Sequence, residues 1–122
     1  MKRNIDLVRN ILLAIESSAD DEPASIRLDH RNNSDIVLSH HVRALHEAGL
    51  IHAIESRRSE GSVWTPHALT WEGHEFVAMV RNDGDWQELK QTAGVQNDDA
   101  PFEIIKALAL QKAQKRAGLL KS

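Results

Sequence analysis

The hydrophobic positions near the start of the chain recur with the period of an α-helix. Between residues 4 and 16, five apolar side chains fall on one helical face: Ile5, Val8, Ile11, Leu12 and Ile15. Their spacing, close to 3.6 residues, predicts an amphipathic helix. Leu7 and Leu13 lie off that face, which is typical of a helix that packs on two neighbours or on a second chain.

A second helix is predicted over residues 34–48. Plotted at about 100° per residue, its apolar stripe consists of Leu38, Val42 and Leu45, and Gly49 follows as a suitable left-handed stop. The opposite face collects a chemically mixed set: Ile36, Ser39, His40, Arg43 and Glu47. The helix therefore has one face suited to a core and one face suited to solvent or a partner.

The residues after this helix predict a β-hairpin. Two stretches, 50–56 and 63–69, have the composition of strands, and the polar segment 57–62 contains a glycine and predicts the turn between them. Pro66 interrupts the returning strand, which favours an edge or an irregular end. A further short strand is predicted at residues 26–29, where apolar and polar residues alternate.

Three more helices are predicted in the second half of the chain. Thr70 caps the first of them, and its expected core face is Leu69, Gly73, Phe76, Met79 and Val80. Residues 82–84 break that helix, and a short helix is expected over 85–92. The last helix is expected over 101–117, beginning at Pro101. Its apolar residues spread round more than half of its circumference: Phe102, Ile104, Ile105, Leu108, Ala109 and Leu110.

This order of elements predicts an α+β fold, a winged helix-turn-helix-like domain with a β-hairpin wing and additional C-terminal helices. We expect one domain over residues 1–122, with a core at 3–82 and a C-terminal helical extension at 84–118. The usual short positioning helix before the recognition helix is not evident. Pro23 and the alternation at 26–29 leave little room for it, so either that helix is degenerate or a strand and loop replace it.

Composition and charge narrow the classes of function. The chain has 122 residues, 41% of them hydrophobic, and no cysteine, which excludes a disulfide scaffold and a thiolate zinc site. No apolar run approaches the roughly 20 residues that span a bilayer, and no signal peptide is visible, so a cytoplasmic protein without membrane contact is expected. The formal net charge is −3. Residues 27–58 are close to neutral but hold five histidines, and such a surface becomes more basic near pH 6.

Three parts of the sequence resemble one known family. They are the opening Met-Lys-Arg-Asn-Ile-Asp-Leu-Val-Arg, the central His-Val-Arg-Ala-Leu followed by Glu-Ala-Gly-Leu-Ile, and the specific string Leu-Thr-Trp-Glu-Gly-His-Glu-Phe at 69–76. The chain is similar over nearly its whole length to an uncharacterised family of small bacterial and prophage proteins, a domain of unknown function. The resemblance implies a winged helix but no activity and no residue roles.

Two functions fit the predicted elements. In the first, a non-catalytic regulatory protein binds DNA and its arginines and polar side chains contact bases and phosphates; the candidate residues are Ile36, Ser39, His40, Arg43, Arg57, Arg58 and Arg31, with His30 adding to the backbone contacts. In the second, a protein-interaction adaptor uses the same surface, and the outward-facing Ile36 favours this alternative. The two terminal helices are expected to seal a homodimer.

Other kinds of site are not supported by the residue pattern. No His-Glu-x-x-His helix, phosphate-binding loop or nucleophile elbow occurs, so we expect no metal, no cofactor and no catalysis. The histidines are interpreted individually, His41 as half-buried and bonded to backbone and His74 as exposed. Trp64, Trp71 and Trp86 are expected to pack in the core or against the wing rather than to form a base-stacking platform.

Overall fold

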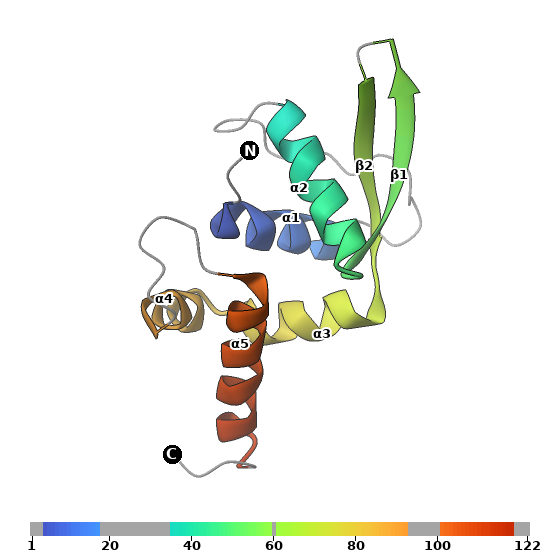
Figure 1. Ribbon diagram of the computed structural model, residues 1–122. Coiled ribbons are helices and arrows are strands. Elements are labelled where there is room, and N and C mark those ends of the chain that lie inside the picture. Colours follow the sequence, from blue (N-terminus) through green and yellow to red (C-terminus); the bar gives the residue numbers. More distant parts are fainter. Residues whose placement is uncertain (1–3, 18–34, 60, 93–100, 119–122) are drawn as a thin grey trace.

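A computed structural model describes residues 4–17, 35–59, 61–92 and 101–118. Its elements are α1 (Ile5–Ser17), α2 (Asp35–Glu47), β1 (Ile51–Arg58), β2 (Gly61–Leu69), α3 (Trp71–Val80), α4 (Asp83–Thr92) and α5 (Phe102–Arg116). Helix α1 contacts α2, α3 and β2 and lies at the centre of the molecule. Figure 1 shows α2 and the hairpin on one side of α1, with α3 and α5 on the other. The described part is a mixed α+β fold.

One buried cluster joins all of these elements. It receives side chains from each helix and from the hairpin, among them Leu12, Val42, Ile51, Phe76, Trp86 and Ile105. Full burial of a large apolar side chain contributes about 1.5 to 3 kcal/mol. Because α4 and α5 supply Trp86 and Ile105, both under 2% exposed, the C-terminal helices share the core of the N-terminal half.

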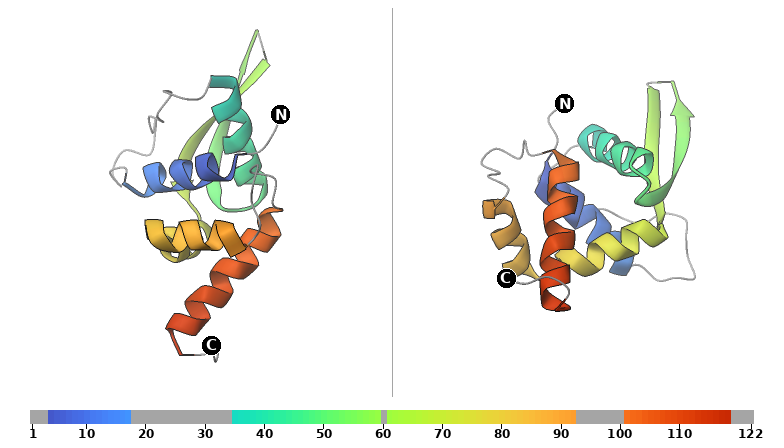
Figure 2. Two further views of the ribbon diagram at one scale, coloured as in Figure 1. Left: turned by 90° about the vertical axis from the view of Figure 1, so that its left-hand side faces the viewer. Right: turned by 60° about the horizontal axis from the view of Figure 1, so that its bottom comes forward.

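The helical face predicted for α1 is confirmed. All five expected side chains are buried, and Leu7 is buried as well, at 5% exposure. Leu13 is half-buried against the same cluster. Figure 2 shows that α1 has α2 on one side and α3 and α4 on the other. A single apolar face could not cover both contacts, so residues outside that face are buried too. Of the two explanations for the off-stripe residues, packing on two neighbours within the chain accounts for Leu7.

Two charged side chains of α1 join it to the α3–α4 connection. The buried guanidinium of Arg9 donates to the backbone oxygens of Val80 and Arg81, each at 2.8 Å, and to Asp83 at 2.6 Å. Asp6 accepts hydrogen bonds of 2.8 Å from Trp86 Nε1 and from Lys90 Nζ. Arg9 thus satisfies the carbonyl groups of Val80 and Arg81 at the C-terminal end of α3, which have no partner within that helix, while Asp6 binds α4.

The carboxylate of Asp6 has a perturbed pKa. Partial burial raises this pKa, but the hydrogen bonds from Lys90 and Trp86 and the positive charges of Lys90 and Arg9 outweigh that effect. The pKa of Asp6 therefore lies below its ordinary value. The shift couples the docking of α4 on α1 to the ionisation of one side chain.

The hairpin is confirmed, with longer strands than the sequence predicted. β1 and β2 are antiparallel, and the register pairs Ile51 with Leu69 at the base and Arg58 with Gly61 at the tip. The turn expected over 57–62 was therefore too long, because the strands continue through Arg58. The register shifts between His52 and Ala53. Pro66 pairs with Ala53 at that point, and such an irregularity suits proline because it has no N–H to donate to a regular ladder.

The later helices follow the sequence with one correction. Thr70 caps α3 as expected, because its Oγ1 accepts the N–H of Gly73 at 3.0 Å. Residues 82–84 were expected to form a break, but α4 begins at Asp83 and contains Gly84. The break is confined to Arg81–Asn82, because the Asn82 side chain accepts the N–H of Asp85 at 2.9 Å and caps the new helix. The strand predicted at 26–29 lies outside the described residues.

Candidate nucleic-acid or partner interface

Helix α2 has a continuous exposed stripe on the side away from the core. Ile36 is 70% exposed, and His40, Arg43 and Glu47 follow it at exposed positions. Residues four, seven and eleven positions apart share one helical face. Leu38, Val42 and Leu45 are buried on the opposite face. The division of α2 into a core face and an outer face is confirmed for these residues.

His41 holds the N-terminal half of α2 against α1. Its ring is 1% exposed, with Nδ1 at 2.8 Å from the carbonyl oxygen of Val37 and Nε2 at 2.9 Å from the backbone nitrogen of Asn4. A carbonyl only accepts and an amide only donates, so the neutral ring with its proton on Nδ1 satisfies both contacts. The expected backbone hydrogen bond is confirmed, although His41 is fully buried rather than half-buried.

The hairpin is attached to the flank of α2 by Ser39. The Ser39 hydroxyl accepts the N–H of Trp64 in β2 at 2.9 Å, and the rings of Trp64 and His46 lie 5.3 Å apart. Ser39 was expected on the outer face, but it is half-buried and faces the hairpin. At about 100° per residue, Ser39 lies between the core face and the outer face of α2. Its hydroxyl is therefore placed to bind the backbone of β2.

The alternation of β1 separates the two arginines near the hairpin tip. Trp64 pairs with Glu55, and because Trp64 contacts α2 through His46, that side of the hairpin is the side of α2. Side chains two residues apart on a strand point the same way. Arg57 therefore lies on the α2 side with Glu55, whereas Arg58 lies on the outer side. Both are exposed, but only Arg57 extends the surface of α2.

The charge of Arg43 is partly balanced within α2. Its Nε donates to the Glu47 carboxylate at 2.9 Å, and both side chains are more than half exposed, at 56% and 61%. An exposed pair four residues apart on a helix contributes only about 0.3 to 0.5 kcal/mol. The guanidinium can therefore exchange Glu47 for an external anion at little cost, although the carboxylate remains beside it.

One tryptophan lies where the sequence did not place it. Trp86 is in the core and Trp64 packs beside α2, as expected, but Trp71 is 75% exposed at the start of α3. The expectation that Trp71 packs in the core or the wing was wrong. Its helical phase is the signal that was available, because Gly73 and Phe76 occupy the buried face of α3 and Trp71 points away from both.

The remaining predictions from the sequence concern Arg31, His30 and His74, a metal site and membrane-spanning helices. Arg31 and His30 lie outside the described residues. Within the described ranges, no three His, Cys, Asp or Glu side chains are grouped so that they could hold a metal ion. In the same ranges no helix is long and apolar enough to cross a membrane. His74 is exposed, as expected.

Comparison with known proteins finds a protein family and a relative that are similar to the chain in sequence. Residues 2–97 match a protein-family model described as "Hypothetical protein (DUF2513)". A Haemophilus influenzae protein described as an uncharacterized protein is 35% identical over 109 residues, which cover 89% of this chain and 92% of the relative. No solved structure matches the chain. Helix α5 begins at Phe102 and so lies beyond the part matched by the family model.

Proposed function

The chain belongs to the DUF2513 family of hypothetical proteins, and from its geometry we propose that it is a non-catalytic winged-helix protein that binds duplex DNA. The exposed stripe of α2 is the surface that enters the major groove, and the hairpin is the wing beside it. An α-helix fits the major groove of B-DNA, and a projecting hairpin suits the adjacent backbone.

The observation that carries this proposal is the shared direction of α2 and the hairpin. Figure 1 shows the hairpin standing beside α2 and extending past the N-terminal end of that helix. The Ser39–Trp64 hydrogen bond fixes the two elements to each other, so Arg43 and Arg57 belong to one rigid surface. Arginine is well suited to both guanine edges and phosphates. The thymine methyl group is the natural contact for Ile36.

A selection from random duplex DNA tests this proposal. The affinity of the selected duplex is then measured at several salt concentrations. We expect Arg43→Ala and Arg57→Ala each to weaken binding and to reduce the slope of log K against log salt by about 1. Lys115→Ala is the matched control, because it removes an exposed charge from α5. No enriched duplex, or salt slopes that match the control, would refute the proposal.

The neighbouring residues Arg57 and Arg58 of β1 allow the same experiment to identify which side of the hairpin faces the duplex. Arg58 points to the side of the hairpin away from α2 by strand alternation. We therefore expect Arg58→Ala to reduce the affinity less than Arg57→Ala does. Equal losses would show that both faces of the wing approach the duplex, and a larger loss for Arg58 would place the DNA on the outer face.

A protein-interaction adaptor is the second candidate, favoured by the 70% exposure of Ile36 and by the Arg43–Glu47 ion pair. These features give the α2 surface an exposed apolar side chain at its N-terminal end and little net charge, which is typical of a protein contact rather than a phosphate contact. Ile36→Ala separates the two functions. It should reduce DNA affinity modestly, whereas it should abolish an apolar protein contact in which Ile36 is the anchor.

A further inference from the structure

Four of the eight residues in the sequence Leu-Thr-Trp-Glu-Gly-His-Glu-Phe at 69–76 have a structural role at the start of α3. Leu69 is buried and Phe76 is in the core, Thr70 caps the helix, and a side chain at Gly73 would collide with the backbone of Leu50. These four residues seat α3 on the segment that joins α2 to β1. The residues between them, Trp71, Glu72, His74 and Glu75, are exposed and take no part in that seating.

Trp71 lies at one end of an extended surface. Glu75 and Ala78 follow it by four and seven residues, so the three side chains share one face of α3 over about 10 Å. Glu75 and Ala78 also line a groove of about 400 Å³ between α3 and α5. The face that begins at the exposed tryptophan therefore continues into this groove.

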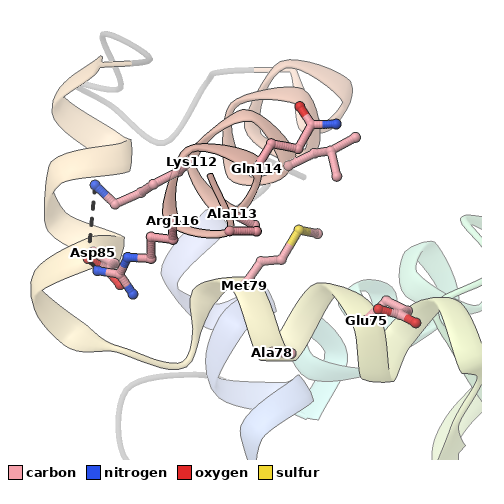
Figure 3. Close-up of a pocket in the computed structure, with 10 residues that line it drawn as sticks. Glu75, Ala78, Met79, Asp85, Lys112, Ala113, Gln114 and Arg116 are labelled. Carbon is pink, nitrogen blue, oxygen red and sulfur yellow. Dashed lines mark hydrogen bonds and ion pairs between the residues drawn. The ribbon is translucent and has the colours of Figure 1, made fainter. Parts of the chain in front are cut away.

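The groove has an apolar floor and a charged rim, as Figure 3 shows. Its floor is formed by Ala78, Met79, Leu110, Ala113 and Ala117. At the end near α4, the charges are already matched, because Arg116 bonds to Asp85 at 2.5 Å and Lys112 bonds to Glu88 at 2.8 Å. Leu110 is 50% exposed, so this apolar surface is left uncovered by the described part of the chain.

The charges at the tryptophan end are not matched. Within the described part of the chain, Glu72 and Glu75 form no ion pair, while Lys112 and Arg116 of α5 are held by Glu88 and Asp85. An exposed indole beside free carboxylates is a favourable place for a lysine or arginine side chain, because the ring face and the carboxylates both attract a cation. Tryptophan is also among the residues that dominate protein interfaces.

We propose that the surface from Trp71 through Glu75 into the α3–α5 groove binds a segment of another protein that carries aliphatic side chains next to a lysine or arginine. The aliphatic side chains fill the groove above Met79, and the cation lies over Trp71 between Glu72 and Glu75. This surface lies on the far side of α1 from α2 and the hairpin (Figure 1). It can be occupied together with the proposed DNA surface, and it does not depend on that proposal.

Selection of a displayed random peptide library on the purified full-length chain tests this inference. We expect enriched peptides to combine leucine or methionine with an adjacent lysine or arginine. Binding of one such labelled peptide, followed by fluorescence anisotropy, should weaken at least tenfold in Trp71→Ala and in Ala78→Gln. Glu75→Gln should weaken it about threefold and reduce its dependence on salt.

The controls make each outcome decisive. Trp71 and Ala78 are exposed, so their variants should keep the urea midpoint of the parent chain, and Ile36→Ala on α2 should bind the peptide normally. Failure to enrich any peptide, an acidic consensus, or unchanged binding in both groove variants would overturn the proposal. A dimer of the chain that dissociates in Ala78→Gln would also overturn it, because a second copy would then be the occupant.

Discussion

The α-carbon of Gly73 lies directly against the carbonyl group of Leu50, and a side chain at position 73 would overlap that oxygen. The same oxygen accepts the N–H of Thr70 at 3.0 Å, and Thr70 Oγ1 donates to the oxygen of Gly49 at 2.6 Å. The first turn of α3 is thus bound to the segment that joins α2 to β1. This contact sets the direction of α3 relative to the α2 surface.

Gly73→Ala is therefore expected to destabilise the protein by about 2 to 3 kcal/mol, although alanine is the better helix former. The clash is with backbone, which cannot rotate away as a side chain could. Urea unfolding measures the effect. Gly84→Ala is the matched control, since its closest neighbour is the side-chain oxygen of Asn82 at 3.2 Å, and it should change the stability by less than about 1 kcal/mol. Equal stability of the two variants would contradict the close packing.

The ionisation of Asp6 should make the docking of α4 sensitive to acid. The pKa of Asp6 is lowered in the folded chain, so the carboxylate contributes stability above its ordinary pKa of about 4. That contribution is lost as the pH falls through the lower folded pKa. Asp6→Asn keeps an acceptor for Trp86 but removes the charge. We expect it to reduce the loss of unfolding free energy between about pH 4 and pH 2.

The size of this effect is limited by exposure, because the Asp6 side chain is 45% exposed. At pH 7 the variant should lose no more than about 1 kcal/mol. Glu103→Gln, on the exposed side of α5, is the control for loss of a carboxylate elsewhere. Unfolding curves for Asp6→Asn that run parallel to those of the parent chain at every pH would show that Asp6 has no part in acid stability.

Removal of the Glu47 charge should strengthen the proposed binding of DNA. Glu47→Gln releases Arg43 from its ion pair and removes a negative charge that repels phosphate. We expect the affinity for a selected duplex to rise about two- to fivefold at low salt, while the unfolding free energy falls by less than about 0.5 kcal/mol. An affinity that is unchanged or reduced would mean that the outer face of α2 does not approach the duplex.

A homodimer stays a prediction, and the structure restricts where it can form. Helix α1 buries its off-stripe Leu7 within its own chain, whereas α5 leaves Ile104, which does not line the α3–α5 groove, 48% exposed. We expect Ile104→Lys to lower the mass measured by light scattering to that of a monomer, because a charge in an apolar contact is costly. A parent chain that is already monomeric at working concentration would contradict the dimer.

Part of this fold was evident in the residue pattern because it depends on local periodicity. The stripes of α1 and α2 repeat every 3.6 residues, and each predicted core residue on them is buried. Thr70 and the hairpin strands were likewise recognisable from their neighbours in sequence. In the candidate site, Ile36, His40 and Arg43 were placed on an exposed face, which follows from helix phase alone.

The sequence by itself determined the element types and their core faces, and the tertiary structure decided what their other side chains do. Ser39 is half-buried instead of exposed on the outer face because its hydroxyl binds the backbone of β2. Arg9 became buried because the end of α3, more than 70 residues away, supplies carbonyl acceptors. Trp71 stayed exposed because Gly73, and not Trp71, meets Leu50. Helix phase is local, whereas these partners depend on segments that meet only after folding.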